Sequence, residues 1–254
     1  MTPEQIADSE SVWKRMEQVY PEFTREHDPS KNYHAVREII LGGSGTWAKA
    51  NSYFGPAPGR KVMDVGANVG IFSTFCGLRG ADVVAYEPFP EIFSMFSSMI
   101  ERTGLDKRVN VVNAAVWTHT GEMPYIGHRT DSEKEGMTFY NGSLPAGGVG
   151  WNPDDSRIIT TKCVSFDDAI GDTEWDMVKV DIEGAEFDLF LSASTEALKR
   201  IKFAYVEFHP WASQELYDAA VNRMKEVFRF EGFFTDESRG RGRYEVVYLF
   251  RKDN

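Results

Sequence analysis

A turn with two glycines, within the segment Lys61–Phe72, carries the residues best suited to approach a ligand. The segment KVMDVGANVGIF joins a short apolar run to a helical apolar pattern, with Gly66 and Gly70 between them. Glycine lets the backbone come close to a ligand because it has no side chain and tolerates positive φ. The start of the following helix offers free N–H groups to polar or anionic ligand atoms. The sequence therefore predicts a buried strand at 61–65, a ligand-binding turn and a helix over 70–79.

Two acids accompany this turn: Asp64 precedes it, and Glu87 ends the next predicted strand, 82–86. A carboxylate at the place of Glu87 can accept hydrogen bonds from both hydroxyls of a ribose. The G-x-x-x-G spacing, with Asp64 in front, fits a cationic amino-acid end better than a pyrophosphate, which Asp64 would repel. S-adenosylmethionine carries an ammonium, a sulfonium and a ribose, so the pattern favours it over a dinucleotide. The structural alternative is a turn whose glycines serve packing alone.

Further acids follow a later predicted strand, 176–180. Asp181 and Glu183 come directly after it, and Gly184 is expected to start the next helix. In open parallel sheets the ligand site lies beyond the carboxyl ends of the strands, so both carboxylates should reach the group that is transferred. The alternative is that Glu183 and Glu186 only stabilise the helix N-terminus electrostatically.

A histidine lies at the end of the predicted strand 202–208, in the run Glu207-Phe-His209. His209 is the expected general base, because a neutral imidazole accepts a proton near neutral pH, and Glu207 could orient it. The alternative is a structural histidine before Pro210. Together with Asp181, these two residues could also hold a divalent cation such as Mg²⁺, although none is expected. No zinc-ligand spacing is present in the sequence.

Strand and helix patterns alternate from Lys61 onward, which predicts right-handed βαβ units and a parallel sheet. The third predicted strand, 109–113, is apolar on both faces and is expected to be buried. A strand pair at 230–235 and 243–251 closes the chain. The remaining predicted strands are 61–65, 82–86, 109–113, 158–164, 176–180 and 202–208. The predicted helices are 70–79, 90–102, 166–170 after a Ser165 cap, 184–191 and 213–228.

Two regions depart from this alternation. Residues 1–58 are loosely helical and predict a small cap, which either covers one face of the sheet or closes over the cofactor. Residues 118–157 interrupt the domain 59–254 with a polar, glycine-rich stretch that could hold a hairpin near 122–126 and 137–140. This stretch is either a surface insert or a substrate lid. The candidate ligand contacts in the two regions are Tyr33, His34, Arg37, Trp47, Tyr140, Trp151 and Arg157.

Charge and composition argue against some classes of function. The formal net charge of −11 argues against broad nucleic-acid binding, which needs a basic surface. The two cysteines, Cys76 and Cys163, lack metal or redox spacing and suggest core thiols of a reducing compartment. We expect a cytoplasmic protein, because the sequence shows neither a signal peptide nor an apolar run near the ~18 residues of a membrane span. The expected partner is a small-molecule or peptide acceptor.

Six motifs, in their order along the chain, resemble the FkbM family of S-adenosylmethionine-dependent methyltransferases. They are DVGANVGIFS, YEPFPEIF, NAAVW, SFDDAI, VKVDIEGAE and YVEFHP. The resemblance covers Lys61 to Pro210 and implies a doubly wound, Rossmann-like class I methyltransferase sheet of seven strands, the last one antiparallel. It implies cofactor binding by Asp64, Gly66, Ala67, Asn68, Gly70, Glu87, Pro88, Asn113, Ala114, Ala115 and Asp181. It places Asp181 and Glu183 beside the methyl centre, so that the expected catalytic residues are Asp181, Glu183, Glu207 and His209.

The same resemblance implies O-methylation of a hydroxyl on a sugar or natural product. N-methylation of an amide or amine, for example on a peptide side chain, is the alternative. A nicotinamide-dependent oxidoreductase and a non-catalytic binding module are further alternatives that the turn and its acids leave open.

Overall fold

The main structural unit is a seven-stranded sheet with the strand order β10-β11-β9-β8-β1-β2-β3. The computed structural model describes residues 11–12, 14–18, 54–130, 139–143, 156–209, 214–236 and 244–252. Strands β3, β2, β1, β8 and β9 pair in parallel, whereas β11 is antiparallel to both β9 and β10. The strands are β1 (Lys61–Val65), β2 (Asp82–Tyr86), β3 (Val109–Val112), β8 (Met177–Val180), β9 (Phe203–Phe208), β10 (Phe228–Asp236) and β11 (Tyr244–Arg251). The predicted α/β sheet with an antiparallel last strand is confirmed.

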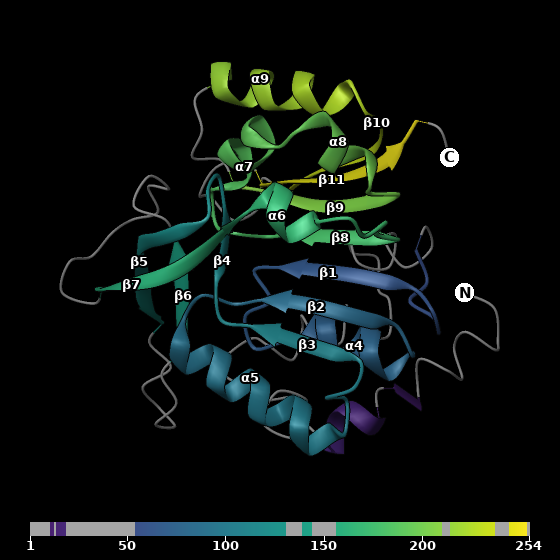
Figure 1. Ribbon diagram of the computed structural model, residues 1–254, viewed down its shortest axis with the longest axis vertical. Helices are drawn as coiled ribbons and strands as arrows, with labels where there is room; N and C mark the ends of the chain where they lie inside the picture. The colour runs from purple at the N-terminus through teal and green to yellow at the C-terminus, as the bar shows by residue number, and fades with distance from the viewer. Residues whose placement is uncertain are drawn as a thin grey trace.

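Helices cover both faces of this sheet, so the fold is doubly wound (Figure 1). Successive strand residues face opposite sides: Val62 packs into one hydrophobic cluster and Met63 into the other. The first cluster includes α4 (Ile71–Leu78) and α5 (Pro90–Thr103). The second includes α6 (Phe166–Ile170), α7 (Glu186–Ser192), α8 (Thr195–Lys199) and α9 (Gln214–Lys225).

A second, four-stranded sheet has the order β4-β7-β5-β6 and lies beside the carboxyl ends of β1 and β2 (Figure 1). Its strands are β4 (Ala115–Trp117), β5 (Gly121–Thr130), β6 (Phe139–Ser143) and β7 (Ser156–Ser165). Its inner face buries Met123, Tyr125 and Thr161, whereas Thr160 and Lys162 are exposed. The hairpin expected within 118–157 is present as the antiparallel pair β5–β6. Trp151 and the side chains of Tyr140 and Arg157 lie outside the described residues.

Several predicted boundaries were wrong. The third strand ends at Val112 as the edge of the main sheet, where Val111 and Val112 are only half-buried, and the following residues join the second sheet. The helix predicted over 213–228 ends at Lys225, and Phe228 opens β10. The helix expected from Gly184 begins at Glu186. Helix α8 was not predicted: its five residues are too few to show a helical period, and its cap Ser194, which accepts the Ala197 N–H, is the signal that was missed.

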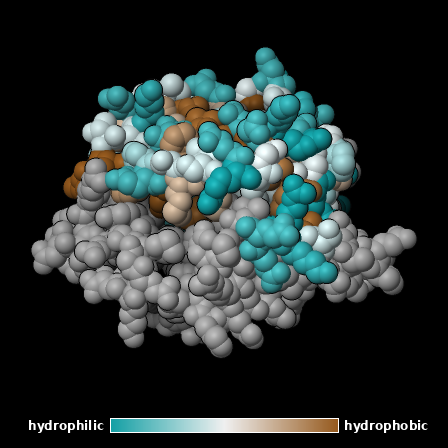
Figure 2. Space-filling model, turned by 90° about the horizontal axis from the view of Figure 1, so that it is seen from below, coloured by the Kyte–Doolittle hydropathy of each residue, from teal (hydrophilic) through white to brown (hydrophobic). Residues whose placement is uncertain are grey.

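The described N-terminal residues between 11 and 18 are helical. Val12 and Met16 belong to the hydrophobic cluster that includes α4 and α5. Figure 2 views the molecule from the side of α5 and shows a mainly hydrophilic surface over the described residues. Among these residues no helix combines the length and the apolar character that crossing a membrane requires. Tyr33, His34, Arg37 and Trp47 lie outside the described residues.

Candidate active site

The glycine turn after β1 is held against the end of β8. Gly66 has φ 82°, and a Cβ on it would lie 1.9 Å from the carbonyl oxygen of Asp181. Gly70 has φ 80°, and a Cβ there would lie 2.0 Å from the Phe96 ring. Any other residue at either place would combine a strained backbone with a steric clash. The two glycines therefore allow the turn to sit against its neighbours, and Asn68, at φ 51°, completes it in the left-handed region.

Glu87 is held in place by the backbone on both sides. Its Oε2 accepts a hydrogen bond from the Asn68 N–H at 2.9 Å, and its Oε1 accepts one from the Phe89 N–H at 2.8 Å. Burial raises the pKa of Glu87 to about 7, although both hydrogen bonds oppose that shift. A carboxylate has about four acceptor positions, so these two bonds leave capacity for the hydroxyls of a ligand.

The loop that carries Glu87 is also supported by the second sheet. The Asn113 side-chain amide donates to the carbonyl oxygens of Glu87 at 2.9 Å and Pro88 at 3.1 Å. The Thr161 hydroxyl, on β7, donates to the same Pro88 oxygen at 3.1 Å. Tyr125, on β5, places its ring 6.5 Å from the Phe89 ring, centroid to centroid. Asn113 thus supports the loop that carries Glu87.

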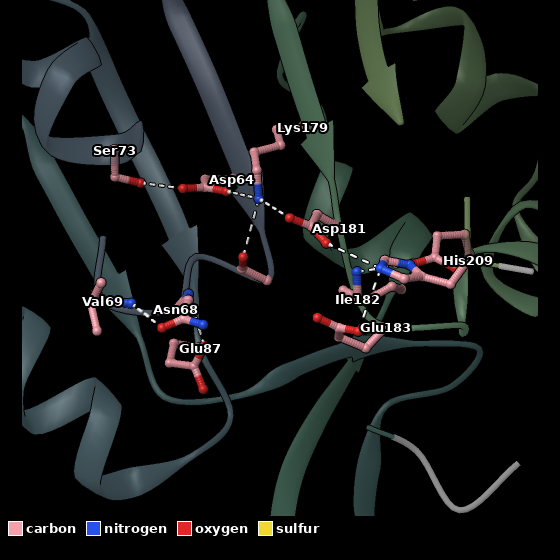
Figure 3. Close-up of polar contacts among 12 residues, drawn as sticks. Asp64, Asn68, Val69, Ser73, Glu87, Lys179, Asp181, Ile182, Glu183 and His209 are labelled. Carbon is pink, nitrogen blue, oxygen red and sulfur yellow. Dashed lines mark hydrogen bonds and ion pairs between the residues drawn. The ribbon is translucent and has the colours of Figure 1, made fainter. Parts of the chain in front are cut away.

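A chain of buried polar contacts runs from Ser73 to Asp181 (Figure 3). The Ser73 hydroxyl donates to Asp64 Oδ2 at 2.7 Å, and Asp64 is fully buried. The Lys179 Nζ lies 3.3 Å from Asp64 Oδ1 and 3.3 Å from Asp181 Oδ2. Burial by itself would lower the pKa of Lys179, but the charges of Asp181 and Asp64 outweigh it and raise the pKa, so the lysine is charged.

Lys179 is a site residue that the sequence reasoning missed. Its signal was a lysine within an apolar strand, two residues before Asp181 and hence on the same face of the strand. Its partner Asp64 is the residue opposite it in the pairing of β1 and β8. That pairing becomes known only when the strand order is known.

His209 is almost fully buried and is surrounded by carboxylates (Figure 3). Its Nδ1 lies 2.9 Å from Glu186 Oε1, and its Nε2 lies 3.4 Å from Glu183 Oε2 and 3.9 Å from Asp181 Oδ1. Burial would lower the pKa of His209, but the hydrogen bond to Glu186 and the three negative charges raise it to about 10. His209 is therefore protonated near neutral pH.

The contacts of this histidine support other roles than the two expected ones. A protonated imidazole cannot serve as the general base, because it has no free lone pair to accept a proton. The carboxylate that orients the ring is Glu186, whose Oε1 pairs with Nδ1, and not Glu207. The sequence pattern had identified Glu186 only as a helix-stabilising acid.

Glu186 also fixes the turn that presents Glu183. Its carboxylate accepts hydrogen bonds from the backbone N–H groups of Ile182 and Gly184. Glu183 has φ 56°, a conformation that is uncommon for a residue other than glycine and often marks functional sites. Burial raises the pKa of Glu183 to about 7, with His209 opposing, and burial together with Asp181 raises that of Glu207 to about 8.

A single cavity at this edge of the sheet joins Glu87 to the acids that follow β8. The predicted site residues that line it are Gly66, Asn68, Glu87, Pro88, Ala114, Ala115, Asp181 and Glu183. The predicted residues that are not part of its wall are Asp64, Ala67, Gly70, Asn113, Glu207 and His209. Lining residues that the sequence reasoning missed are Tyr86, Ile92, Val116, Tyr125, Ile182 and Ala185. Most of these are apolar, and sequence pattern alone cannot distinguish a cavity wall from core.

Asp181, Glu207 and His209 each offer one atom that could bind a cation, and these atoms lie within 4.8 Å of one another. A cation there would bind Nε2, the nitrogen near Asp181, in place of its proton, because Nδ1 is paired with Glu186. No role assigned to these residues below depends on a cation at this cluster.

Comparisons with known proteins agree with this architecture. The sequence model of the methyltransferase FkbM domain matches residues 64–234. The chain is similar in structure to methyltransferase FkbM from Methylobacillus flagellatus KT, with a TM-score of 0.53 and 15% sequence identity, over 96% of this chain and 60% of that one. The chain thus spans less than two thirds of that protein's length.

The chain is also similar to magnesium protoporphyrin IX methyltransferase from Synechocystis PCC 6803 with bound SAH. The TM-score is 0.49 and the identity 10%, over 96% of this chain and 95% of that one. No curated protein sequence matches the chain. At 15% identity, the likeness to the methyltransferase FkbM structure establishes the fold alone.

Proposed function

Because the chain belongs to the family of FkbM methyltransferases, we propose that it binds S-adenosylmethionine in the cavity at the carboxyl edge of the sheet and methylates a hydroxyl group of a neutral acceptor. The observation that supports this most is one cavity with Glu87 in its wall together with Asp181 and Glu183. Family membership favours this function over a nicotinamide-dependent oxidoreductase or a non-catalytic module.

The residues of the cavity fit the three parts of this cofactor. Glu87 accepts hydrogen bonds from the ribose hydroxyls with the lone pairs that Asn68 and Phe89 leave free. Asp181 faces the ammonium of the amino-acid end, and the turn at Gly66 leaves no room for a Cβ between the two strands. The apolar lining at Ile92, Ala114, Ala115 and Val116 suits the adenine.

Glu183 is the general base in this proposal. When bound, S-adenosylmethionine supplies an electrophilic methyl group on a positively charged sulfur. Glu183 lines the cavity, its side chain is 36% exposed, and its pKa of about 7 lets it take up a proton near neutral pH. It accepts the proton that the acceptor hydroxyl loses, while the charged His209 holds its carboxylate in place from 3.4 Å.

The charge of the site restricts the acceptor. Among the described residues, carboxylates outnumber the two cations, Lys179 and His209, around the end of β8. An anionic acceptor, such as a phosphorylated sugar, would be repelled there, whereas a neutral sugar or natural product would not. An amine is the second candidate, because the same charges attract an ammonium and Glu183 can take up its proton.

Calorimetry tests the cofactor. We expect S-adenosylhomocysteine to bind the full chain and NADH not to bind, since the turn lacks the dinucleotide spacing. Binding of NADH alone would contradict the proposal.

A transfer assay then tests the acceptor class. S-adenosylmethionine with a labelled methyl group would be offered with three matched acceptor sets: neutral polyhydroxyl compounds, amines, and their phosphorylated counterparts. We expect label in the neutral hydroxyl set. Label only in the phosphorylated set would contradict the charge argument, and label only in the amine set would replace O-methylation with N-methylation.

A further inference from the structure

We propose that Lys179 is a positioning residue for the amino-acid end of the cofactor: it neutralises Asp64 and holds Asp181, so that Asp181 is the acid presented to the ligand ammonium. This inference rests on the proposed function, because it assigns a residue to the methionine end of the same cavity.

Lys179 connects three segments that meet at the site (Figure 3). Its Nζ lies 3.3 Å from Asp64 Oδ1 on β1 and 3.3 Å from Asp181 Oδ2 after β8. It also donates a hydrogen bond to the carbonyl oxygen of Gly66, within the glycine turn, at 3.2 Å. The Lys179 side chain is only 7% exposed, so these contacts are made away from water. One ammonium group thus links the strand, the turn and the acid.

Asp64 is not placed to receive the ligand itself. It is fully buried and is not part of the cavity wall. Its Oδ2 accepts a hydrogen bond from the Ser73 hydroxyl. Its Oδ1 forms the ion pair with Lys179 and accepts no hydrogen bond from the described residues. The charge of Asp64 is therefore directed to Lys179. This differs from the expectation that the acid before the turn would contact the cationic end of the ligand.

Asp181 has the opposite placement. Its side chain is 29% exposed and lines the cavity. Lys179 holds its Oδ2, which leaves Oδ1 facing away from that lysine, 3.9 Å from His209 Nε2. Without Lys179, the Asp181 carboxylate would lose its nearest cation while Asp64 and further acids stayed close by. We expect the carboxylate then to turn away from Asp64 and to lose its alignment toward the ligand.

Two ligands separate this role from a merely structural one. S-adenosylhomocysteine has the amino-acid end, and methylthioadenosine carries the same adenine and ribose without it. Loss of Lys179 should therefore weaken the first ligand and spare the second. A general disturbance of the fold would weaken both ligands alike.

The experiment is calorimetric titration of both ligands into the full chain and three variants. In Lys179→Met we expect the affinity for S-adenosylhomocysteine to fall about tenfold or more, the scale of a lost charged hydrogen bond, with methylthioadenosine nearly unchanged. The double variant Asp64→Asn/Lys179→Met removes both charges of the buried pair, which proteins tolerate better than removal of one. It should show the same selective loss, and it carries the test if the single variant does not fold.

Lys202→Met is the matched control. Lys202 forms an ion pair of similar length, 3.0 Å from Asp176, at the opposite end of the same strands, although it is more exposed than Lys179. Both affinities should remain unchanged in this variant. Equal losses for the two ligands in the folded double variant, or no loss, would overturn the role of Lys179. Failure of the wild-type chain to bind either ligand would instead overturn the proposed function.

Discussion

The two ends of strand β8 both carry ionic groups, but the ends differ in burial and in the balance of charge. At the amino end, Asp176 lies 3.2 Å from an Arg60 nitrogen and 3.0 Å from the Lys202 Nζ, and it accepts the Lys61 N–H at 2.9 Å. Burial would raise the pKa of Asp176, but these donors together lower it. One acid is thus matched by two cations and a backbone donor.

At the carboxyl end, acids outnumber cations in the part of the chain that the structure describes. Lys179 and His209 lie among five carboxylates, those of Asp64, Asp181, Glu183, Glu186 and Glu207. The pKa values of Glu183 and Glu207 are raised to about 7 and about 8, the reverse of the shift at Asp176. An excess of partly buried negative charge costs stability, and such costs are typical of functional sites. The comparison teaches that burial and charge balance act together: burial among like charges raises the carboxyl pKa values at the reactive end, whereas cations and a backbone donor match the less deeply buried Asp176 at the other end.

The largest expected effect is on turnover in Glu183→Gln. Glutamine cannot take up the acceptor proton, so we expect kcat to fall about 10²–10⁴-fold, with little change in the affinity for S-adenosylhomocysteine. In the wild-type enzyme kcat should rise with pH through about 7, as Glu183 loses its proton. The exposed acid Glu196, on α8, provides the control variant Glu196→Gln, with unchanged kcat. A Glu183→Gln enzyme with normal kcat would remove Glu183 as the base.

Glu87→Gln should weaken the cofactor next most strongly. Loss of a charged acceptor at the ribose predicts roughly 10- to 100-fold weaker binding of S-adenosylhomocysteine by calorimetry. Asp82→Asn tests the other end of the same strand, where the exposed Asp82 pairs with Arg108 at 3.1 Å, and should leave binding unchanged. Similar losses in both variants would mean that the two ends of β2 do not differ in function.

The ionisable groups at the carboxyl end of β8 should make the stability of the protein depend on pH. A group whose pKa is raised by folding binds its proton more tightly in the folded state, so stability falls as pH rises. Glu207 contributes stability that is lost as the pH rises from its usual pKa of 4.5 to its folded-state pKa of about 8. His209 contributes stability that is lost between its usual pKa of 6.5 and about 10. The lowered pKa of Asp176 has the opposite sign, with stability lost as pH falls through it.

Urea denaturation between pH 5 and pH 10 measures this dependence. We expect the free energy of unfolding to fall toward pH 10, and to fall less between pH 5 and pH 8 in Glu207→Gln. An identical slope in the variant and the wild type would contradict the raised pKa of Glu207.

The smallest effect is expected at the amino end. Asp176→Asn removes the acceptor of two cations, and we expect it to cost about 1–2 kcal/mol of unfolding free energy in urea. The affinity for S-adenosylhomocysteine should stay as in the wild type. Weaker ligand binding in a folded Asp176→Asn protein would contradict the claim that only the carboxyl end of β8 takes part in binding.

The order of elements was largely predictable, because it depends on local periodicity. Strands β1 and β2 were predicted with their bounds, and the Ser165 cap of α6 accepts the Asp168 N–H as expected. The prediction failed where neighbours decide the outcome. The run after Val109 is apolar throughout, but its first part is the edge of one sheet and its second part belongs to another.

The candidate site also has features that were predictable from the sequence and features that were not. The sequence by itself determined which acids follow the strand ends and where glycines allow the turn, because a parallel sheet brings all its carboxyl ends to one edge. Only the tertiary structure decided that Asp64 faces inward to Lys179, that Asp181 and Glu183 face the cavity, and that Glu186 holds His209. The protonation of His209 depends on charges from segments distant in sequence, and their sum exists only once β8 and β9 lie side by side.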